Sequence, residues 1–200
     1  MLDARVRPLI DPPLNWLGRA LARRGWTADR VTLAGLALGL IAALVVALGA
    51  PEWALIPLLA SRLMDGLDGA VARATSKTDF GGYLDIWCDF VFYGAVPFGF
   101  AILDPDNAIA AAFLLLAFYV NGASFLGLAI MAEKRGLATT AQGQKSLYYS
   151  AGLLEGTETI VFFVLLCLFP AHFAALAWVF GALCLLTAVA RVANARHQLT

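Results

Sequence analysis

Charged residues and soft metal ligands are scarce in this chain of 200 residues. Charged residues make up 14% of it, and it has only two histidines and three cysteines. No two cysteines form a CxxC pair, so the spacing typical of a structural zinc site or a redox pair is missing. Basic and acidic residues balance at a formal net charge of zero, which argues against a nucleic-acid partner. Hydrophobic residues reach 61% and the mean hydropathy is +0.78, which excludes an ordinary soluble domain.

The hydrophobic residues gather in stretches close to the length of about 20 residues that crosses a bilayer. An amphipathic segment precedes them, because Leu14, Leu17 and Leu21 share one helix face while the arginines lie toward the other. We therefore expect an all-α integral membrane protein with six transmembrane helices preceded by an amphipathic juxtamembrane helix. The single domain, residues 1–200, would comprise an N-terminal segment (1–30), a membrane core (31–192) and a tail (193–200). The expected spans are 31–50, 53–73, 81–103, 108–132, 151–169 and 172–192.

The basic residues gather in alternate connections of this arrangement. Six lie before residue 31, two at residues 73–77, three at 134–145 and two after residue 190; Arg73 and Arg191 stand at the ends of spans, and Arg62 alone lies in the interior of one. The connections near residues 51, 105 and 171 contain no Lys or Arg. By the positive-inside rule, both termini and the connection after the second span are cytoplasmic. The expected location is the inner membrane of a bacterium.

Four aspartates interrupt the second and third hydrophobic stretches. Asp65 and Asp68 are three residues apart, and Asp85 and Asp89 are four apart, so each pair shares a helix face. The connection at residues 74–80 is short, which makes the two helices antiparallel neighbours whose acidic faces can converge. An ionised carboxylate at membrane depth costs at least about 2.5 kcal/mol. Such a group therefore needs a cation, a water-filled cavity, or both.

Carboxylates without nearby histidine or cysteine suit Mg²⁺ or Mn²⁺ rather than zinc or copper. Four of them could hold two ions, an arrangement that clamps a phosphate during an in-line displacement. Gly69 and Ala72 leave room for a bulky ligand, and Arg73 is placed to meet a phosphate or a nucleotide. These residues indicate metal-dependent chemistry on a phosphorylated substrate at the cytoplasmic surface. An ion or solute transporter that uses the aspartates as its path fits the same acids about equally well.

The full pattern D-x2-D-G-x2-A-R-x7-G-x3-D-x3-D, from Asp65 to Asp89, resembles the signature of the CDP-alcohol phosphatidyltransferase family at every specified position. The segment from Thr27 to Thr32 is similar to the family's T-P-[ND]-x-[VI]-T element, with alanine in place of proline. The resemblance implies transfer of a phosphatidyl or similar substituted phosphate group from a CDP-linked lipid, such as CDP-diacylglycerol, to an alcohol. CMP would be released, in phospholipid biosynthesis. The resemblance also implies a homodimer embedded in membrane lipid.

The resemblance also implies a role for each residue of the pattern. Two metal ions, Mg²⁺ or Mn²⁺, would be bound by Asp65, Asp68, Asp85 and Asp89. Asp89 would in addition take the proton from the acceptor hydroxyl. The CDP-linked lipid would be contacted by Asp29, Arg30, Val31, Thr32, Gly69, Arg73 and Thr78.

The second half of the chain bears on the acceptor alcohol. Relatives that use a phosphorylated acceptor resemble K-x-R-x-E where Ala129 and Met131 fill the two basic positions here. Residues 155–159, E-G-T-E-T, likewise resemble E-R-x-E-R with both arginines replaced. A phosphate needs basic donors nearby, so we expect an acceptor without a phosphate, held by Glu155, Glu158 and Lys145. The alternative is a phosphorylated acceptor, such as glycerol 3-phosphate or inositol phosphate, held by Lys134, Arg135 and Lys145.

Overall fold

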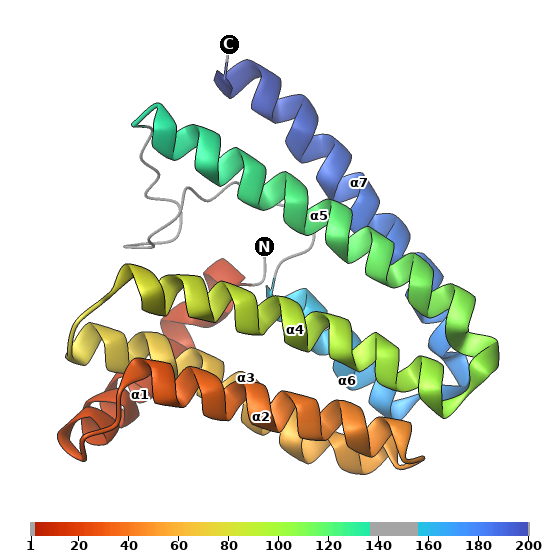
Figure 1. Cartoon of the computed structure of the whole chain (residues 1–200), viewed down its shortest axis with the longest axis horizontal. Coiled ribbons are helices and arrows are strands. Elements are labelled where there is room, and N and C mark those ends of the chain that lie inside the picture. The colour runs from red at the N-terminus through yellow and green to blue at the C-terminus, as the bar shows by residue number, and fades with distance from the viewer. Residues whose placement is uncertain (1–2, 137–155, 200) are drawn as a thin grey trace.

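The computed structural model describes residues 3–136 and 156–199, and all regular elements in these ranges are helical (Figure 1). The predicted hydrophobic stretches correspond to α2–α7, with ends shifted by a few residues; residues 151–155 lie outside the described ranges. Two 3-10 helices, η1 (Pro105–Asn107) and η2 (Pro170–His172), lead into α5 and α7. The α-helices are α1 (Asp3–Arg23), α2 (Ala28–Ala47), α3 (Pro51–Ala74), α4 (Asp79–Leu103), α5 (Ala108–Lys134), α6 (Gly156–Leu168) and α7 (Phe173–Leu199).

Four stretches of the described residues are long and apolar enough to cross a membrane: Ala28–Ala47, Asp79–Leu103, Pro105–Lys134 and Pro170–Arg196. The chain is therefore an integral membrane protein. The predicted count of six spans is not confirmed by length and composition. α3 has the length, but it carries the charged residues of the aspartate pattern, and the described part of α6 is only 13 residues long.

Threonines cap the two helices that begin at the same end of the bundle. The Thr27 hydroxyl accepts a hydrogen bond from the Arg30 N–H at 3.3 Å, at the start of α2. The Thr78 hydroxyl accepts one from the Gly81 N–H at 3.0 Å, at the start of α4. Such caps satisfy N–H groups that have no partner inside the helix. They fix where α2 and α4 begin. Both starts lie next to the residues of the two family patterns, the first from Asp65 to Asp89 and the second from Thr27 to Thr32.

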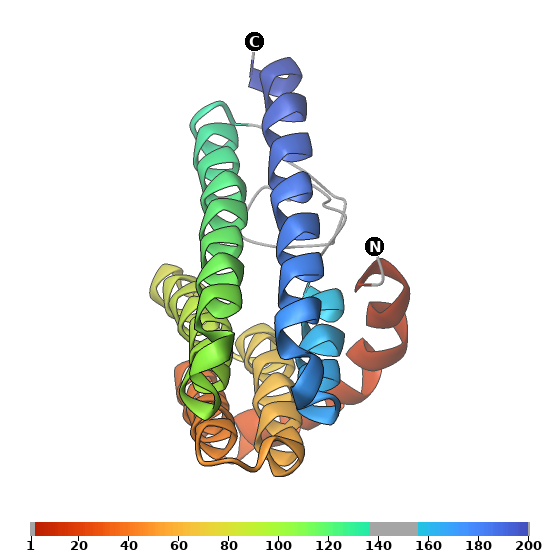
Figure 2. The same ribbon diagram turned by 90° about the vertical axis from the view of Figure 1, so that its right-hand side faces the viewer.

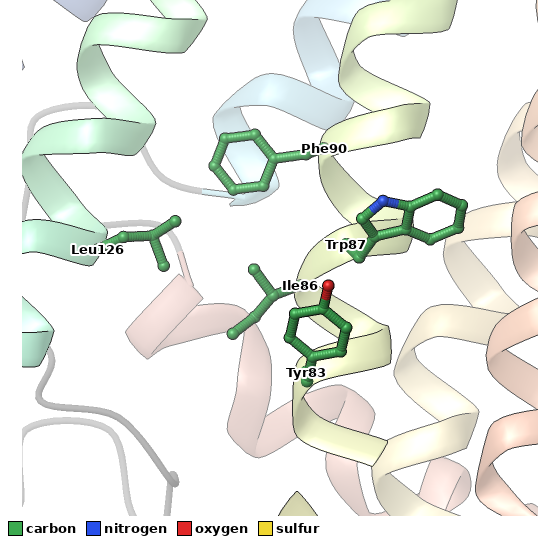
Figure 3. A pocket seen from close by; sticks show the side chains of 5 residues that line it. All are labelled: Tyr83, Ile86, Trp87, Phe90 and Leu126. Atoms are coloured by element: carbon green, nitrogen blue, oxygen red, sulfur yellow. The ribbon is translucent and has the colours of Figure 1, made fainter. Parts of the chain in front are cut away.

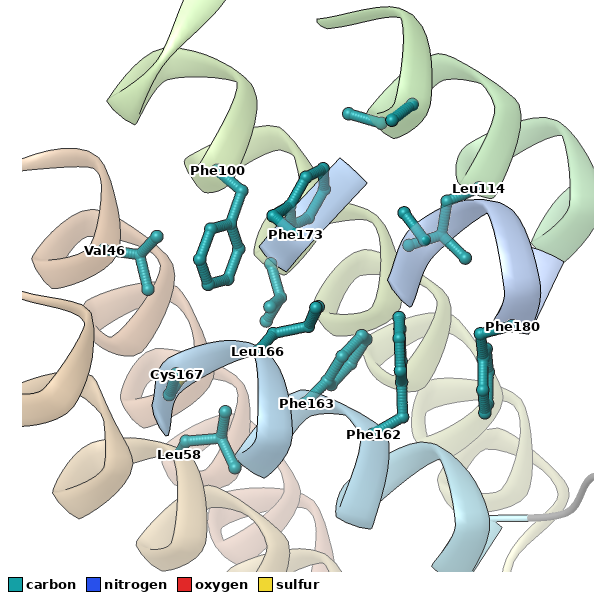
Figure 4. Close-up of a cluster of buried hydrophobic side chains, with 14 of the residues drawn as sticks. Val46, Leu58, Phe100, Leu114, Phe162, Phe163, Leu166, Cys167, Phe173 and Phe180 are labelled. Carbon is teal, nitrogen blue, oxygen red and sulfur yellow. The ribbon is translucent and has the colours of Figure 1, made fainter. Parts of the chain in front are cut away.

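The helices pack into two groups that share one apolar core. α2 packs on α3 and α4, whereas α5 packs on α7, and α6 lies against α3 (Figures 1 and 2). α4 and α5 meet near η1 and diverge toward their other ends (Figure 1). Aromatic pairs fill the core, with ring centroids 4.7 Å apart for Phe100 and Phe173 and 4.0 Å apart for Phe162 and Phe180 (Figure 4). This core occupies the half of the bundle near η1 and η2, so the aspartates lie outside it.

α1 packs directly on the part of α3 that carries the aspartate pattern. A Cβ atom added to Gly18 of α1 would lie 2.6 Å from the Cβ of Ala70, and Leu14 Cδ1 lies 3.0 Å from the Cβ position of Gly66. The small residues therefore allow the two helices to approach closely. The predicted N-terminal helix is present and extends through three prolines to Asp3. Its position at a membrane surface stays a prediction.

Candidate active site

Three aspartates come together where α3 and α4 face each other. Asp65 of α3 and Asp85 and Asp89 of α4 each place one carboxylate oxygen within 4.8 Å of the others, and all three side chains are half-buried. The helix period puts Asp85 and Asp89 one turn apart on the same face. The two acidic faces thus meet as their spacing predicts, and we call these three residues the carboxylate cluster.

Asp68, the fourth aspartate of the pattern, lies outside this group of three and has a different neighbour. Its side chain is buried, and Oδ2 accepts a hydrogen bond of 2.7 Å from the Thr32 hydroxyl. Thr32 lies on α2, so this bond ties α2 to α3 beside the carboxylate cluster. The orientation of Asp68 is therefore set by a residue from the second family pattern.

A cation from the chain lies against the carboxylate cluster. Arg62 Nη1 donates a hydrogen bond of 2.9 Å to Asp89 Oδ1 and lies 3.5 Å from Asp65 Oδ1. Its guanidinium carbon is 3.8 Å from the centroid of the Phe92 ring. Arg62, three residues before Asp65, therefore pairs with an acid of α3 and an acid of α4.

Residues expected to contact a CDP group lie at the end of the bundle where α2 and α4 begin. Arg73 donates from Nε and Nη2 to the Asn15 side-chain oxygen of α1, at 3.1 and 2.9 Å. A Cβ atom added to Gly69 would lie 3.3 Å from Arg73 Nη1, so the glycine leaves room for the guanidinium. Asp29 Oδ1 and the Thr78 hydroxyl lie 3.2 and 3.0 Å from the corresponding Cβ position of Gly81. The start of α2 and the start of α4 are therefore neighbours.

The remaining residues of the second family pattern differ in exposure. Arg30 is exposed, whereas Val31 is fully buried and packs against Leu67 and Val71 of α3. Val31 thus supports the start of α2 by packing.

Sequence reasoning did not find the contact between Asn15 and Arg73, because the two residues are 58 positions apart and no periodic pattern links them.

The predicted acceptor residues are only partly described. Glu158 is half-buried near the start of α6, while Lys145 and Glu155 lie outside the described residues.

Sequence reasoning assigned Arg191 of α7 to topology alone, yet its side chain is buried. Arg191 Nη1 donates to the Asn121 carbonyl, the Asn121 side-chain oxygen and the Ser124 hydroxyl, at 3.1, 2.9 and 2.6 Å. Two polar residues three apart in the apolar α5 were the signal that could have found this contact.

A shallow apolar pocket of about 220 Å³ lies on another face of α4 (Figure 3). Its lining contains no acidic residue, so it has none of the oxygen ligands of the carboxylate cluster. Trp87 lies between Asp85 and Asp89 in the sequence, is half-exposed and belongs to this lining. The lining residues are Tyr83, Ile86, Trp87, Phe90 and Leu126.

The chemistry of the carboxylate cluster fits a divalent cation of the hard class. Its donors are carboxylate oxygens alone, from two helices, and such ligands suit Mg²⁺ or Mn²⁺. Three carboxylates this close repel one another unless a positive charge lies among them. Arg62 supplies one positive charge, which leaves the site with a negative balance that a divalent cation can offset.

Comparison with known proteins gives this site a context. Residues 26–193 match the model of the CDP-alcohol phosphatidyltransferase family. The inner membrane protein YnjF of Escherichia coli is 50% identical over 193 residues, which cover 96% of this chain and 94% of that protein. The archaetidylinositol phosphate synthase of Pyrococcus horikoshii is 36% identical over 100 residues, covering 50% of this chain and 53% of that enzyme.

A solved structure shows that the fold is shared as well. The crystal structure of Mycobacterium tuberculosis phosphatidylinositol phosphate synthase (PgsA1) with CDP-DAG bound superposes with a TM-score of 0.73 at 24% identity. The match covers 91% of this chain and 92% of that one. The structure of the same enzyme in complex with manganese and citrate gives a TM-score of 0.72. Because the family model matches residues 26–193, the chain belongs to the CDP-alcohol phosphatidyltransferase family and is a membrane-embedded transferase.

Proposed function

We propose that this protein transfers a phosphatidyl or equivalent substituted phosphate group from a CDP-linked lipid, such as CDP-diacylglycerol, to an alcohol, with release of CMP. The observation that carries the proposal is the convergence of Asp65, Asp85 and Asp89 across α3 and α4 in a chain of this family. Relatives named as phosphatidylinositol phosphate and archaetidylinositol phosphate synthases support a role in phospholipid biosynthesis. Family membership favours this reaction over the transporter that the acids alone also permit.

In this proposal the four aspartates hold two divalent cations, Mg²⁺ or Mn²⁺. The solved complex of PgsA1 with manganese supports the choice of metal class. Bound divalent cations neutralise a diphosphate and stabilise the leaving group of an in-line displacement. Asp65, Asp85 and Asp89 provide oxygens from two helices, and the Thr32 hydroxyl holds Asp68 beside them.

Asp89 is the proposed general base. Its carboxylate takes the proton from the acceptor hydroxyl, whose oxygen forms a bond to the lipid-linked phosphorus. The phosphorus–oxygen bond to CMP breaks at the same centre, and CMP leaves with the electron pair. Arg62 Nη1 holds Asp89 Oδ1 at 2.9 Å and so fixes the orientation of the carboxylate.

The donor is proposed to bind at the end of the bundle where α2 and α4 begin. The PgsA1 structure with CDP-DAG bound supports a CDP-linked lipid as donor for the family fold. Gly69 gives the Arg73 guanidinium room, and the adjoining starts of α2 and α4 bring Asp29 close to Thr78. Val31 supports this end from the core. The proposed donor contacts are Asp29, Arg30, Thr32, Gly69, Arg73 and Thr78.

Asn15→Ala tests whether α1 orients Arg73 for the donor. A hydrogen bond contributes about 0.5–1.5 kcal/mol net, so we expect the KM for CDP-diacylglycerol to rise about threefold to tenfold while kcat changes little. Steady-state CMP release at varied donor concentration measures both. Asn107→Ala makes the same change at the opposite end of the bundle, where Asn107 donates to the Phe100 carbonyl at 3.5 Å. Equal KM values for the two variants would contradict the role of Asn15.

The acceptor is proposed to lack a phosphate. Ala129 is buried and Met131 is exposed at the two α5 positions where a basic pair is expected for a phosphorylated acceptor. The buried cation of α7, Arg191, already donates to Asn121 and Ser124. Glu158, with Glu155 and Lys145 beyond the described residues, is proposed to hold a hydroxylated or amine-bearing acceptor.

A panel of alcohols tests this choice of acceptor. Purified protein would receive labelled CDP-diacylglycerol, Mn²⁺ and alcohols with and without a phosphate, and the lipid products would be separated. We expect a labelled product with an acceptor that has no phosphate and none with its phosphorylated counterpart. A product formed only from glycerol 3-phosphate or inositol phosphate would establish the alternative.

The membrane arrangement completes the proposal. α2–α7 are proposed to cross the bacterial inner membrane as six spans of a single domain, a location supported by the inner membrane relative. The basic connections place both termini and the carboxylate cluster on the cytoplasmic side, and the active form is proposed to be a homodimer. Membrane-impermeant labelling in cells of a single cysteine at position 2 or 106, introduced after the three native cysteines are replaced, would test the orientation. Only position 106 is expected to react.

A further inference from the structure

The positive charge of Arg62 offsets part of the negative charge of the carboxylate cluster. Its Nη1 lies 2.9 Å from Asp89 Oδ1 and 3.5 Å from Asp65 Oδ1, so one nitrogen reaches carboxylates of both helices. These two aspartates also contribute oxygens to the group that could hold a metal ion. The guanidinium and a divalent cation would therefore draw on the same carboxylates.

The Arg62 side chain is fixed in this position. It is only 8% exposed, and the Phe92 ring lies 3.8 Å from its guanidinium carbon. Nη2 donates to the Ser61 hydroxyl at 3.2 Å, and that hydroxyl donates to the Gly35 carbonyl at 2.7 Å. A buried arginine loses the free energy of hydration of its charge, and nearby carboxylates offset that loss. The half-buried carboxylates lose hydration too, and the arginine offsets their loss in turn.

We propose that Arg62 is a resident counter-cation of the carboxylate cluster, which stabilises the metal-free site and lowers its affinity for divalent cations. The inference rests on the proposed function, because it takes Asp65, Asp85 and Asp89 to be metal ligands. A cation that binds these oxygens is repelled by the nearby guanidinium and competes with it for Asp65 and Asp89. Arg62 thus acts on the metal through the aspartates, as a positioning residue.

The test compares Mn²⁺ binding by full-length wild-type protein and two neutral variants, Arg62→Met and Arg62→Gln, all purified in excess Mn²⁺ and then stripped by a chelator. The electron paramagnetic resonance signal of free Mn²⁺ gives the Kd. We expect Mn²⁺ to bind both variants at least about tenfold more tightly, equal to about 1.4 kcal/mol. Without metal the variants should unfold at a lower temperature than wild type, and Mn²⁺ should raise their unfolding temperature by more.

Two further variants separate the charge of Arg62 from the loss of a buried arginine. Arg62→Lys keeps a positive charge, so its Kd for Mn²⁺ should stay within about threefold of wild type. Arg191→Met removes another buried arginine, whose hydrogen bonds go to Asn121 and Ser124 of α5 rather than to an aspartate. Its Kd for Mn²⁺ should equal that of wild type.

The outcomes distinguish this inference from the proposed function. Wild-type protein that binds no Mn²⁺ would overturn the metal site itself, and the inference with it. Wild-type binding together with an unchanged or weaker Kd in the neutral variants would overturn the inference alone. Failure of both neutral variants to fold in excess Mn²⁺ would also overturn it, because the arginine would then be required whether or not metal is bound.

Discussion

Asp89→Asn is expected to lower kcat by at least about 100-fold, the lower end of what a general base contributes, while metal-dependent binding of CDP-diacylglycerol stays close to that of the wild type. The amide cannot take the proton of the acceptor hydroxyl. It keeps the shape of the side chain and an oxygen that can accept the hydrogen bond from Arg62 Nη1, which is 2.9 Å long in the wild-type protein. The site should therefore stay assembled. CMP release measures kcat, and equilibrium binding of labelled CDP-diacylglycerol with Mn²⁺ measures the donor affinity.

Asp106→Asn is the matched control for this variant. Asp106 is an exposed aspartate of η1, at the end of the bundle opposite to the carboxylate cluster. The same loss of one negative charge there should leave both kcat and donor binding unchanged. An Asp89→Asn protein with kcat within about tenfold of wild type would show that another group takes the proton.

Asp65→Asn is expected to abolish metal binding, donor binding and turnover together. Asp65 is the member of the carboxylate cluster that comes from α3, so its loss leaves Asp85 and Asp89 as a one-sided pair on α4. Without the charge of Asp65, the positive charge of Arg62 also offsets a larger share of the negative charge that remains on Asp85 and Asp89. We expect the Kd for Mn²⁺ to rise at least about 100-fold, equal to about 2.8 kcal/mol.

The contrast between Asp65→Asn and Asp89→Asn carries the assignment of roles. Mn²⁺ titration and donor binding measured on both variants under the same conditions give that contrast directly. Asp65→Asn protein that binds CDP-diacylglycerol as tightly as wild type would show that the donor does not need the metal held by this residue. The Asp106→Asn control applies here as well.

The helices and their antiparallel order could be predicted from the sequence, because long apolar stretches and the period of 3.6 residues are local signals. The same period placed Asp65 on one face of α3 and Asp85 and Asp89 on one face of α4. A short connection was then enough to bring those faces together. Thr27 and Thr78 are caps of a kind that local sequence also reveals.

The contacts that orient these aspartates could not be predicted in the same way. Thr32 and Asp68 are 36 positions apart, and Arg62 and Asp89 are 27 apart. A periodic pattern gives the face on which a residue lies, but the partner it meets depends on how separate helices approach each other. That approach is set by small residues such as Gly99, where an added Cβ would lie 2.6 Å from the Ala43 carbonyl oxygen of α2.

Metal-dependent release of CMP by the purified protein, with CDP-diacylglycerol as donor, tests the central claim most directly. The assay compares Mg²⁺, Mn²⁺ and a chelator in the presence of a set of alcohols, with the Asp89→Asn protein as the inactive reference. We expect CMP release with one acceptor that requires a divalent cation and is absent from the reference. Absence of both CMP release and metal-dependent nucleotide binding, with ion flux through the protein in vesicles, would contradict the account and establish a transporter.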